Sequence, residues 1–324
     1  LNLHHSSSEA PRMPINGSDP AACFMGRGAR YLRADPTRGV NLEPEQNEES
    51  NMNLTDELFQ RYSDLVYQEC GINLHEGKKA LLQARLNKRL RATGFASYEQ
   101  YYEHITSPGN SGEFIHFLDS ISTNLTYFFR ESQHFDFLNK RLPELLETKI
   151  KEKNPKLRIW SAGCSTGEEP YSIAMCVIPH LEGLPRIDFR ILATDISTHA
   201  LNTAMRGIYS EEKAGKVPEA FRSQHFRTLK NHNGRREFEV ASALRDRITF
   251  GRLNLKDPFP FKGLFDFIFC RNVMIYFDKK TQEMIVHKLA RYLSPGGYLL
   301  VGHSESLMGL SHSLRYVCPA VYRK

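Results

Sequence analysis

The sequence predicts an α/β protein: an open, mainly parallel sheet with helices on both faces, a small all-α domain before it and a small β-rich insertion within it. Three observations lead there. From Leu157 to Tyr322, short apolar runs alternate with helical patterns, as they do where helices join parallel strands. From Asn53 to Ser122, apolar residues recur only at helical spacing. Between about 208 and 246 the alternation gives way to a hairpin pattern.

Composition limits the class of protein. The chain has 324 residues, a formal net charge of +6 and six cysteines. This length accommodates two domains, and the basic bias favours an acidic partner: nucleic acid, a membrane surface or a protein. The cysteines lack CxxC spacing, so we expect reduced thiols and no metal. No apolar run nears the ~18 residues of a membrane span and no signal-peptide pattern is present, so we expect a cytoplasmic protein.

Residues 1–52 are rich in Ser, Pro, Gly, Asn and Glu and show no periodicity. We expect a disordered tail, or sequence that is foreign to the fold. The chain starts with Leu1, and Met52 directly precedes the first patterned segment, which favours the second interpretation.

Four short helices are predicted over residues 53–124, and together they make a small all-α domain. Thr55 can cap the first helix and Gly71 ends it, and Ser97 with Gln100 forms a capping box for the third. The second helix runs from about Gly77 to Thr93, with Gly94 as its stop, and the fourth lies near Glu113–Ser122.

The second of these helices has an unusual charge pattern, because the run from Lys78 to Arg91 contains basic residues and no acidic one. The basic residues are Lys78, Lys79, Arg85, Lys88, Arg89 and Arg91. A helix that is merely soluble usually carries i,i+4 salt bridges, so this unpaired row favours docking of an acidic partner. The alternative is a solvated helix face.

The segment Ile121–Phe135 places Asn124, Thr126 and Arg130 among aromatic residues. The spacing allows a turn and helix that present the three polar groups on one side. An apolar hinge between domains, with incidental polar residues, explains the pattern equally well.

A strand, a turn of small residues and a helix follow in the run LRIWSAGCSTGEEPYS, Leu157–Ser172. In parallel sheets this unit forms a ligand crevice, because small side chains let a ligand approach the backbone. Glu168 and Glu169 at the helix start repel phosphate and favour a ligand with hydroxyls or positive charge. The lysine of a nucleotide-binding P-loop is absent, which argues against a nucleoside triphosphate.

Polar residues also end the strands that follow. The strand Phe189–Ser197 contains Asp195, which can accept both hydroxyls of a ribose, although a loop or helix-capping aspartate is the alternative. A strand over Arg247–Leu255 reaches Asn254, and another over Phe265–Ile275 carries Arg271 and Asn272 and leads to Tyr276.

The remaining elements complete the sheet. Within the insertion, over residues 208–246, two strand-like runs flank Asn231–Gly234, which predicts a hairpin that either decorates the fold or offers its edge to a peptide. Asp278 caps a helix from about Lys279 to Leu293. A strand over Tyr298–Gly302 and one final antiparallel strand over Leu314–Tyr322 follow.

The carboxyl ends of parallel strands face one crevice, so these polar side chains should meet there. The set suits a nucleoside that carries a free amino acid, namely S-adenosylmethionine. Asp195 would take the ribose, Asn254 the adenine edge and Glu169 an ammonium or hydroxyl group. Methyl transfer from this cofactor is an in-line displacement, and a carboxylate acceptor requires no strong base.

Five segments, in order over Leu54–Tyr322, resemble the chemotaxis receptor methyltransferase (CheR) family: STNLTYFFRE, WSAGCSTGEEPYS, ATDIS, FCRNVMIYF and LSPGGYLLVGHSE. The resemblance implies a Rossmann-like class I methyltransferase domain over residues 125–324, behind the helical domain. It implies methyl transfer from S-adenosylmethionine to glutamate side chains of chemoreceptors, with S-adenosylhomocysteine as product. We expect a monomer with no nucleic acid partner and no membrane insertion.

The resemblance also assigns residues. The cofactor set would be Asn124, Thr126, Arg130, Glu169, Asp195, Asn254, Leu255, Arg271 and Asn272. Arg130 would pair with the cofactor carboxylate, Tyr276 would lie near the transferred methyl group, and either could orient the acceptor. Lys78, Arg85, Lys88, Arg89 and Arg91 would dock the receptor. Some relatives bind a receptor pentapeptide through a glycine-bearing turn of the insertion; here KNHNGRRE holds one glycine, Gly234, which departs from that pattern.

Two other functions remain open. A methyltransferase of the same fold can act on a small molecule or nucleic acid, but for amino-group targets we expect an Asn/Asp-Pro-Pro-aromatic motif, which Cys270–Tyr276 lacks. A non-catalytic, cofactor-sensing adaptor is the other, and the retention of Glu169, Asp195 and Arg130 argues against it.

Overall fold

The computed structural model describes residues 53–184 and 187–324, and the expected tail over residues 1–52 lies outside them. Among the described residues, no helix has both the length and the apolar character needed to span a membrane. Residues Met52–Lys324 form one compact unit.

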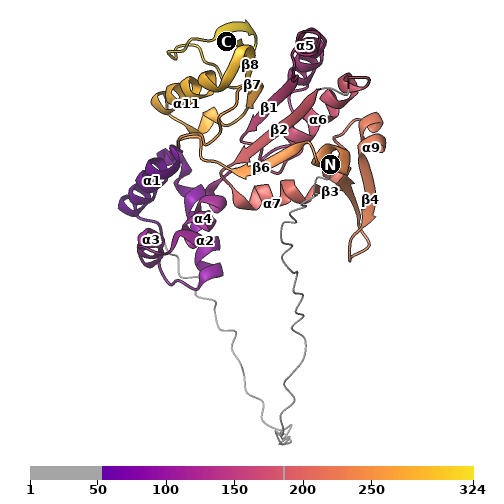
Figure 1. The fold of residues 1–324 in the computed structure, drawn as a ribbon. Coiled ribbons are helices and arrows are strands. Elements are labelled where there is room, and N and C mark those ends of the chain that lie inside the picture. The colour runs from indigo at the N-terminus through magenta and orange to yellow at the C-terminus, as the bar shows by residue number, and fades with distance from the viewer. Residues whose placement is uncertain (1–52, 185–186) are drawn as a thin grey trace, which may run out of the picture. The chain divides into compact units, whose positions relative to one another are not determined.

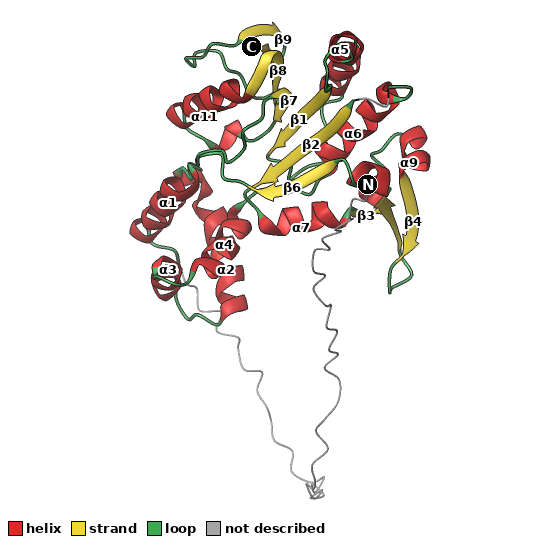
Figure 2. Cartoon of the chain, viewed as in Figure 1, coloured by secondary structure: helices red, strands yellow, loops and turns green. Residues whose placement is uncertain are grey.

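The N-terminal part is all-helical, as predicted (Figures 1 and 2). Its first helix begins where the Thr55 hydroxyl accepts a hydrogen bond from the Leu58 amide, and it ends at Gly71 in the left-handed conformation. Tyr62, Leu86 and Phe117 are fully buried between the helices. The elements are α1 (Asp56–Cys70), the 3₁₀ turn η1 (Glu76–Lys78), α2 (Lys79–Thr93), α3 (Tyr98–Thr106) and α4 (Ser111–Ile121).

A seven-stranded sheet follows, in the order β6-β2-β1-β7-β8-β10-β9. Strand β1 pairs in parallel with β2 on one side and with β7 on the other, so the chain changes direction across the sheet beside β1. A crevice forms at such a reversal, outside the carboxyl ends of the strands. The strands are β1 (Lys156–Ala162), β2 (Asp188–Asp195), β6 (Ile248–Arg252), β7 (Phe265–Cys270), β8 (Leu293–Val301), β9 (Arg315–Cys318) and β10 (Val321–Arg323).

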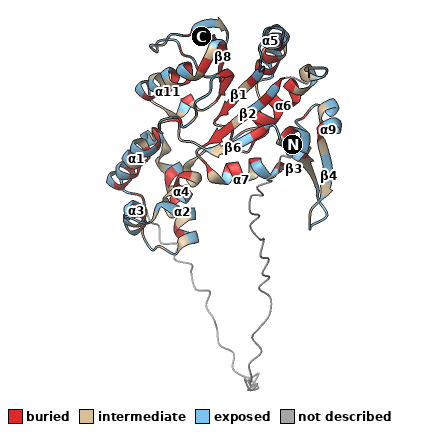
Figure 3. Cartoon of the chain, in the orientation of Figure 1, coloured by how far each residue is buried: buried red, intermediate tan, exposed pale blue. Residues whose placement is uncertain are grey.

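Helices cover both faces of the sheet, and the central strand β7 is buried along its whole length (Figure 3). Alternation along β1 directs Ile159 into one core and Trp160 into the other. The first core includes residues of α5 (Gln133–Lys149), α6 (Glu168–Leu181) and α7 (Thr198–Arg206), and the second includes residues of α11 (Lys279–Tyr292).

The predicted β-rich insertion is a three-stranded antiparallel sheet of order β3-β5-β4, so the hairpin prediction is confirmed. The Asn231 side chain closes the hairpin by accepting hydrogen bonds from the Asn233 and Arg235 amides, at 3.0 and 2.9 Å. The insertion comprises β3 (Ile208–Ser210), α8 (Glu211–Ala214), α9 (Glu219–His225), β4 (Phe226–Lys230), β5 (Arg236–Val240) and α10 (Ser242–Arg245).

Several predicted strands differ in extent. The run predicted over Arg247–Leu255 is a strand only as β6 (Ile248–Arg252), and β8 begins at Leu293, earlier than the predicted Tyr298. The run predicted to end at Ile275 leaves the sheet at Cys270 and continues as the 3₁₀ turn η2 (Met274–Tyr276). The expected final strand is divided into β9 and β10, which form a hairpin. The turn between them contains Pro319, which cannot donate a ladder hydrogen bond, and Ala320, which adopts the left-handed conformation with φ of 62°. Strand β10 then pairs antiparallel with β8, as predicted.

Several contacts between the helical part and the sheet part involve main-chain groups. The Asp119 carboxylate on α4 accepts a hydrogen bond from the Thr198 amide at the start of α7, at 2.9 Å. Lys256 donates to the carbonyls of Tyr67 and Gln68 at the end of α1. These side chains therefore cap helix ends across the junction.

Candidate active site

The turn after β1 requires small residues for packing as well as for ligand access. Gly163 has φ of +87°, and a Cβ there would lie 2.4 Å from Cγ2 of Val273 in the segment after β7. Gly167 has φ of +96°, and a Cβ there would lie 2.7 Å from the Cβ of Ala204 on α7. The turn is thus held between its neighbours, and its position is fixed relative to both.

A cavity of about 400 Å³ lies at the carboxyl ends of the strands, as the alternation of strands and helices predicts. It is bounded by the turn after β1, the ends of β2 and β7, the segment before α5, and the start of α2. All of the cofactor residues named from the sequence line it, together with Tyr276 and Lys78: Asn124, Thr126, Arg130, Glu169, Asp195, Asn254, Leu255, Arg271 and Asn272.

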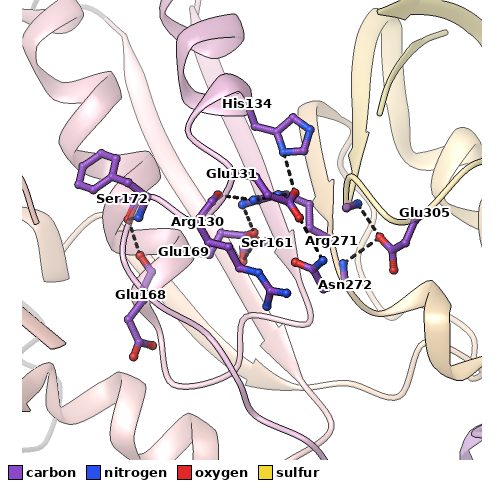
Figure 4. A network of polar contacts seen from close by, with 12 residues as sticks. Arg130, Glu131, His134, Ser161, Glu168, Glu169, Ser172, Arg271, Asn272 and Glu305 are labelled. Carbon is purple, nitrogen blue, oxygen red and sulfur yellow. Dashed lines mark hydrogen bonds and ion pairs between the residues drawn. The ribbon is translucent and has the colours of Figure 1, made fainter. Parts of the chain in front are cut away.

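The two carboxylates at the start of α6 have different surroundings (Figure 4). Glu169 lines the cavity, where its oxygens accept from the Ser161 hydroxyl at 2.7 Å and from Arg271 Nη1 at 2.9 Å. Glu168 is fully buried and pairs with Lys213 Nζ of the insertion at 2.6 Å. Only Glu169 is therefore available to a ligand, and burial raises the pKa of its carboxyl.

Arg271 links the two sides of the cavity. It is 5% exposed, and its guanidinium also contacts Glu131 Oε2 at 3.0 Å and the carbonyl of Arg130. Burial opposes ionisation of Glu131, but Arg271 and Asn272 outweigh it and lower the pKa of this carboxyl. Sequence reasoning missed Glu131, although it directly follows Arg130 in the quoted segment STNLTYFFRE.

Asp195 orders the loops around it and also lines the cavity. Its oxygens accept hydrogen bonds from the Ser165 amide at 2.7 Å and from the Ser197 amide at 2.9 Å, and it lines the cavity. It is 8% exposed; burial raises its pKa, and the two amides offset part of that shift. Asp195 thus fixes the turn, and its expected contact with a ribose stays a prediction.

The side chain of Asn254 is engaged at the junction with α1. Its Nδ2 donates to the Glu69 carbonyl at 2.8 Å, and its Oδ1 accepts from the Lys256 amide at 3.0 Å. The expected contact with an adenine edge stays a prediction, and in this conformation the amide group mainly orders the loop.

Arg130 and Tyr276 come from opposite ends of the domain sequence to the same cavity. Arg130 is half-buried and donates through Nη1 to the Leu125 carbonyl at 2.7 Å. The Tyr276 carbonyl accepts from the Asn73 amide at 2.8 Å, which fixes η2 against the segment between α1 and α2. The structure therefore brings together the two residues named as catalytic.

The backbone around the cavity is unusual. Among the described residues, five non-glycine residues have positive φ. Ser165 and Asn272 line the cavity, and Phe129 and Glu131 flank the lining residue Arg130. Such conformations persist where surrounding contacts hold them and often occur at functional sites. At Asn272, the Glu305 carboxylate supplies such a contact by accepting from the amide at 2.8 Å.

The basic helix is only partly as predicted. Arg89 is not unpaired: it binds Glu113 of α4 at 2.7 Å. Lys79 pairs with Asp56. Over residues 53–184 and 187–324, no carboxylate oxygen lies within 4.0 Å of the charged nitrogens of Lys78, Arg85, Lys88 or Arg91. The uncompensated row is therefore shorter than the sequence suggests.

The strand order, with a crevice beside β1 that Glu169 and Asp195 line, is that of an S-adenosylmethionine-dependent methyltransferase fold. The family model "CheR methyltransferase, SAM binding domain" matches residues 124–321, and "CheR methyltransferase, all-alpha domain" matches residues 57–122. The chain belongs to the CheR family of chemotaxis protein methyltransferases, as the five segments predicted, and its cofactor is S-adenosylmethionine.

Curated relatives cover most of the chain. It is 44% identical over 278 residues to the chemotaxis protein methyltransferase of Borreliella burgdorferi, covering 85% of this chain and 96% of that one. It is 42% identical to the probable chemotaxis protein methyltransferase of Rhizobium etli, covering 76% and 91%. The chemotaxis protein methyltransferase of Escherichia coli is 38% identical, with 83% and 91% covered.

Proposed function

We propose that this chain transfers a methyl group from S-adenosylmethionine to glutamate side chains in the cytoplasmic helices of chemoreceptors. The observation that carries the proposal is that one cavity is lined both by the predicted cofactor residues and by Lys78 at the start of the basic helix. One chain supplies both the cofactor residues and the docking helix, so we propose that the enzyme acts as a monomer. Because the proposed acceptor helices are cytoplasmic, we also propose that the enzyme is cytoplasmic.

The proposal divides the chain by task. Residues 53–124 dock the receptor, and residues 125–324 bind the cofactor and carry out the transfer, with an insertion over about 208–246. Junction contacts such as Asp119 with Thr198 support this division, because they keep the docking helices in register with the cavity.

The lining suits the cofactor. Each oxygen of Asp195 uses one lone pair on a backbone amide, so lone pairs remain for the ribose hydroxyls. Glu169 offers negative charge to an ammonium group. Arg130 offers its guanidinium to a carboxylate, because its hydrogen bond to the Leu125 carbonyl occupies only Nη1. Leu255 adds apolar surface of the kind that a purine ring needs.

Bound S-adenosylmethionine supplies a methyl group on a positively charged sulfur. An oxygen of the acceptor carboxylate forms the new bond to carbon while the carbon–sulfur electron pair goes to sulfur. No proton moves, so the chain needs no general base. Opposite charges disappear in the step, and a cavity that excludes water favours it. Arg130 and Tyr276 would hold the carboxylate in line with the methyl group.

The test is a methyl-transfer assay with radiolabelled cofactor and chemoreceptor-containing membranes. We expect label on the receptor that base releases, which is the behaviour of an ester. Asp195→Asn should lose cofactor affinity and label together, whereas Tyr276→Phe should keep cofactor affinity and lower kcat. Base-stable label, or none with cofactor bound, would refute glutamate as the acceptor.

A further inference from the structure

A cluster of potential metal ligands lies beside the cavity, outside the set named from the sequence. Glu131, His134 and His303 each offer one ligand atom, and these atoms lie within 4.8 Å of one another. Glu131 lies just before α5, His134 is in the first turn of α5, and His303 follows β8. The cysteine pattern led us to expect no metal, but these residues are far apart in sequence and have no zinc-motif spacing.

His134 is the member that points to a ligand. It is 1% exposed, and among the described residues neither ring nitrogen has a hydrogen-bond partner. Burial, and then the Arg271 charge, lower its pKa to about 3, so the ring is neutral at neutral pH. A buried polar nitrogen without a partner is unfavourable. A neutral imidazole is also the form that binds metal ions.

The spacing fits a shared ion better than a direct bond. His134 Nδ1 lies 3.4 Å from Glu131 Oε2, which is long for a hydrogen bond. Two ligands on a tetrahedral zinc ion, each about 2.0–2.1 Å from the metal, are themselves about 3.4 Å apart. His303 is exposed and its ring centroid lies 4.7 Å from that of His134, so rotation of the side chain can bring in the third nitrogen.

The surroundings of Glu131 resemble the outer shell of a metal site. Arg271 and Asn272 donate to its two oxygens and fix the carboxylate, as hydrogen bonds commonly do for metal-ligating carboxylates. Arg271 also binds Glu169, so its single charge is divided between two carboxylates. Glu131 therefore retains attraction for a cation.

We propose that Glu131, His134 and His303 bind a divalent transition metal ion, with zinc as the best match and water as the fourth ligand. One carboxylate and two imidazoles form the ligand set of an open, three-residue zinc site. A metal ion on Glu131 would bring a second positive charge beside Arg271 and so shift the positions of Arg271 and Asn272, which hold that carboxylate. Because both residues line the cavity, zinc should weaken cofactor binding, and this second claim rests on the proposed function.

Binding is measured on the whole chain without cofactor, by titrating zinc against a chromophoric chelator and by recording the visible spectrum with cobalt. The first variant is His303→Ala, and the matched control is the exposed His199→Ala on α7. All proteins carry His4→Ala and His5→Ala, which removes the paired histidines of the N-terminal segment. We expect one tetrahedral metal per chain, with affinity at least about tenfold lower in His303→Ala and unchanged in the control.

The outcomes are distinct. Equal affinity in His303→Ala and His199→Ala, a thiolate absorption band with cobalt, or no metal binding would overturn the site. A second variant, His134→Gln, checked for folding by circular dichroism, should also lose the metal. Calorimetry with S-adenosylhomocysteine then tests the coupling: unchanged affinity in zinc refutes it. Metal binding without any cofactor binding would refute the proposed function and leave the site standing.

Discussion

The guanidinium of Arg89 on α2 binds the Glu113 carboxylate on α4 through three contacts of 3.0, 2.8 and 2.7 Å. The two side chains are only 20% and 14% exposed, and the Tyr101 hydroxyl donates to the same carboxylate at 2.6 Å. Arg89 therefore joins two helices of the docking domain, and its charge is compensated before any partner arrives.

We predict that Arg89→Ala lowers the free energy of unfolding by about 1–3 kcal/mol, because it leaves a half-buried carboxylate without its charged partner. Urea denaturation measures the change. Lys88→Ala, at the exposed neighbouring position, is the control and should change stability by less than about 0.5 kcal/mol. Similar effects from both substitutions would mean that the ion pair contributes nothing specific.

Arg85 and Lys88 should contribute to binding of the receptor and not to the stability of the fold. The double variant Arg85→Ala, Lys88→Ala removes two uncompensated charges, so we predict a several-fold rise in the KM for receptor and a weaker dependence of that KM on salt. Affinity for S-adenosylhomocysteine should not change. Lys151→Ala with Lys153→Ala removes two exposed charges after α5 and is the charge-matched control. If it raises the receptor KM as much, net charge and not the α2 row governs docking.

Cofactor binding should weaken on acidification because of Asp195. Its raised pKa means that the carboxyl takes up a proton at a higher pH than an ordinary aspartate, whose pKa is about 3.9. We therefore expect the Kd for S-adenosylhomocysteine to rise on acidification, at a higher pH than protonation of an ordinary aspartate would cause. Asp195→Asn should bind more weakly at every pH, with a flatter profile. If the Kd of Asp195→Asn depends on pH as strongly as that of the unmodified protein, another group causes the pH dependence. Glu169→Gln then tests whether that group is Glu169.

The mouth of the cavity has an apolar rim, defined here as Leu125 and Ile275, which are 73% and 52% exposed and belong to the lining. We predict that the rim packs on apolar residues beside the acceptor glutamate. Leu125→Ser should then raise the receptor KM by a factor equivalent to about 1–2 kcal/mol and leave cofactor affinity unchanged. Met308→Ser is the control, because Met308 is 88% exposed and lies outside the lining. Equal effects would show that rim burial is not part of docking.

Local sequence patterns were sufficient to predict the parts of the site whose positions follow from the order of strands and helices along the chain. Glu169 and Asp195 could be placed because Glu169 begins the helix after one strand and Asp195 ends the next strand. The carboxyl ends of parallel strands meet at one edge of the sheet. The helix limits at Thr55 and Gly71 were equally accessible, because caps are local.

Other features depend on contacts between distant segments. That Arg89 is paired follows from the packing of α2 on α4, 24 residues further along the chain, and no pattern within α2 reveals it. The engagement of Asn254 with Glu69 spans 185 residues. The same holds for Glu131, His134 and His303, which the fold brings together from either end of the sheet domain.

The contacts at the junction have one further consequence, because the groups that Asp119, Lys256 and Asn254 hold on the other side are largely backbone atoms of α7 and α1. Main-chain atoms are common to every sequence, so surface substitutions in α1 or α7 leave these contacts in place. A chimera that combines the helical part of one relative with the sheet part of another should therefore assemble, provided that these three side chains and the Tyr67–Asp278 pair are kept. Receptor preference would then be exchangeable as a module.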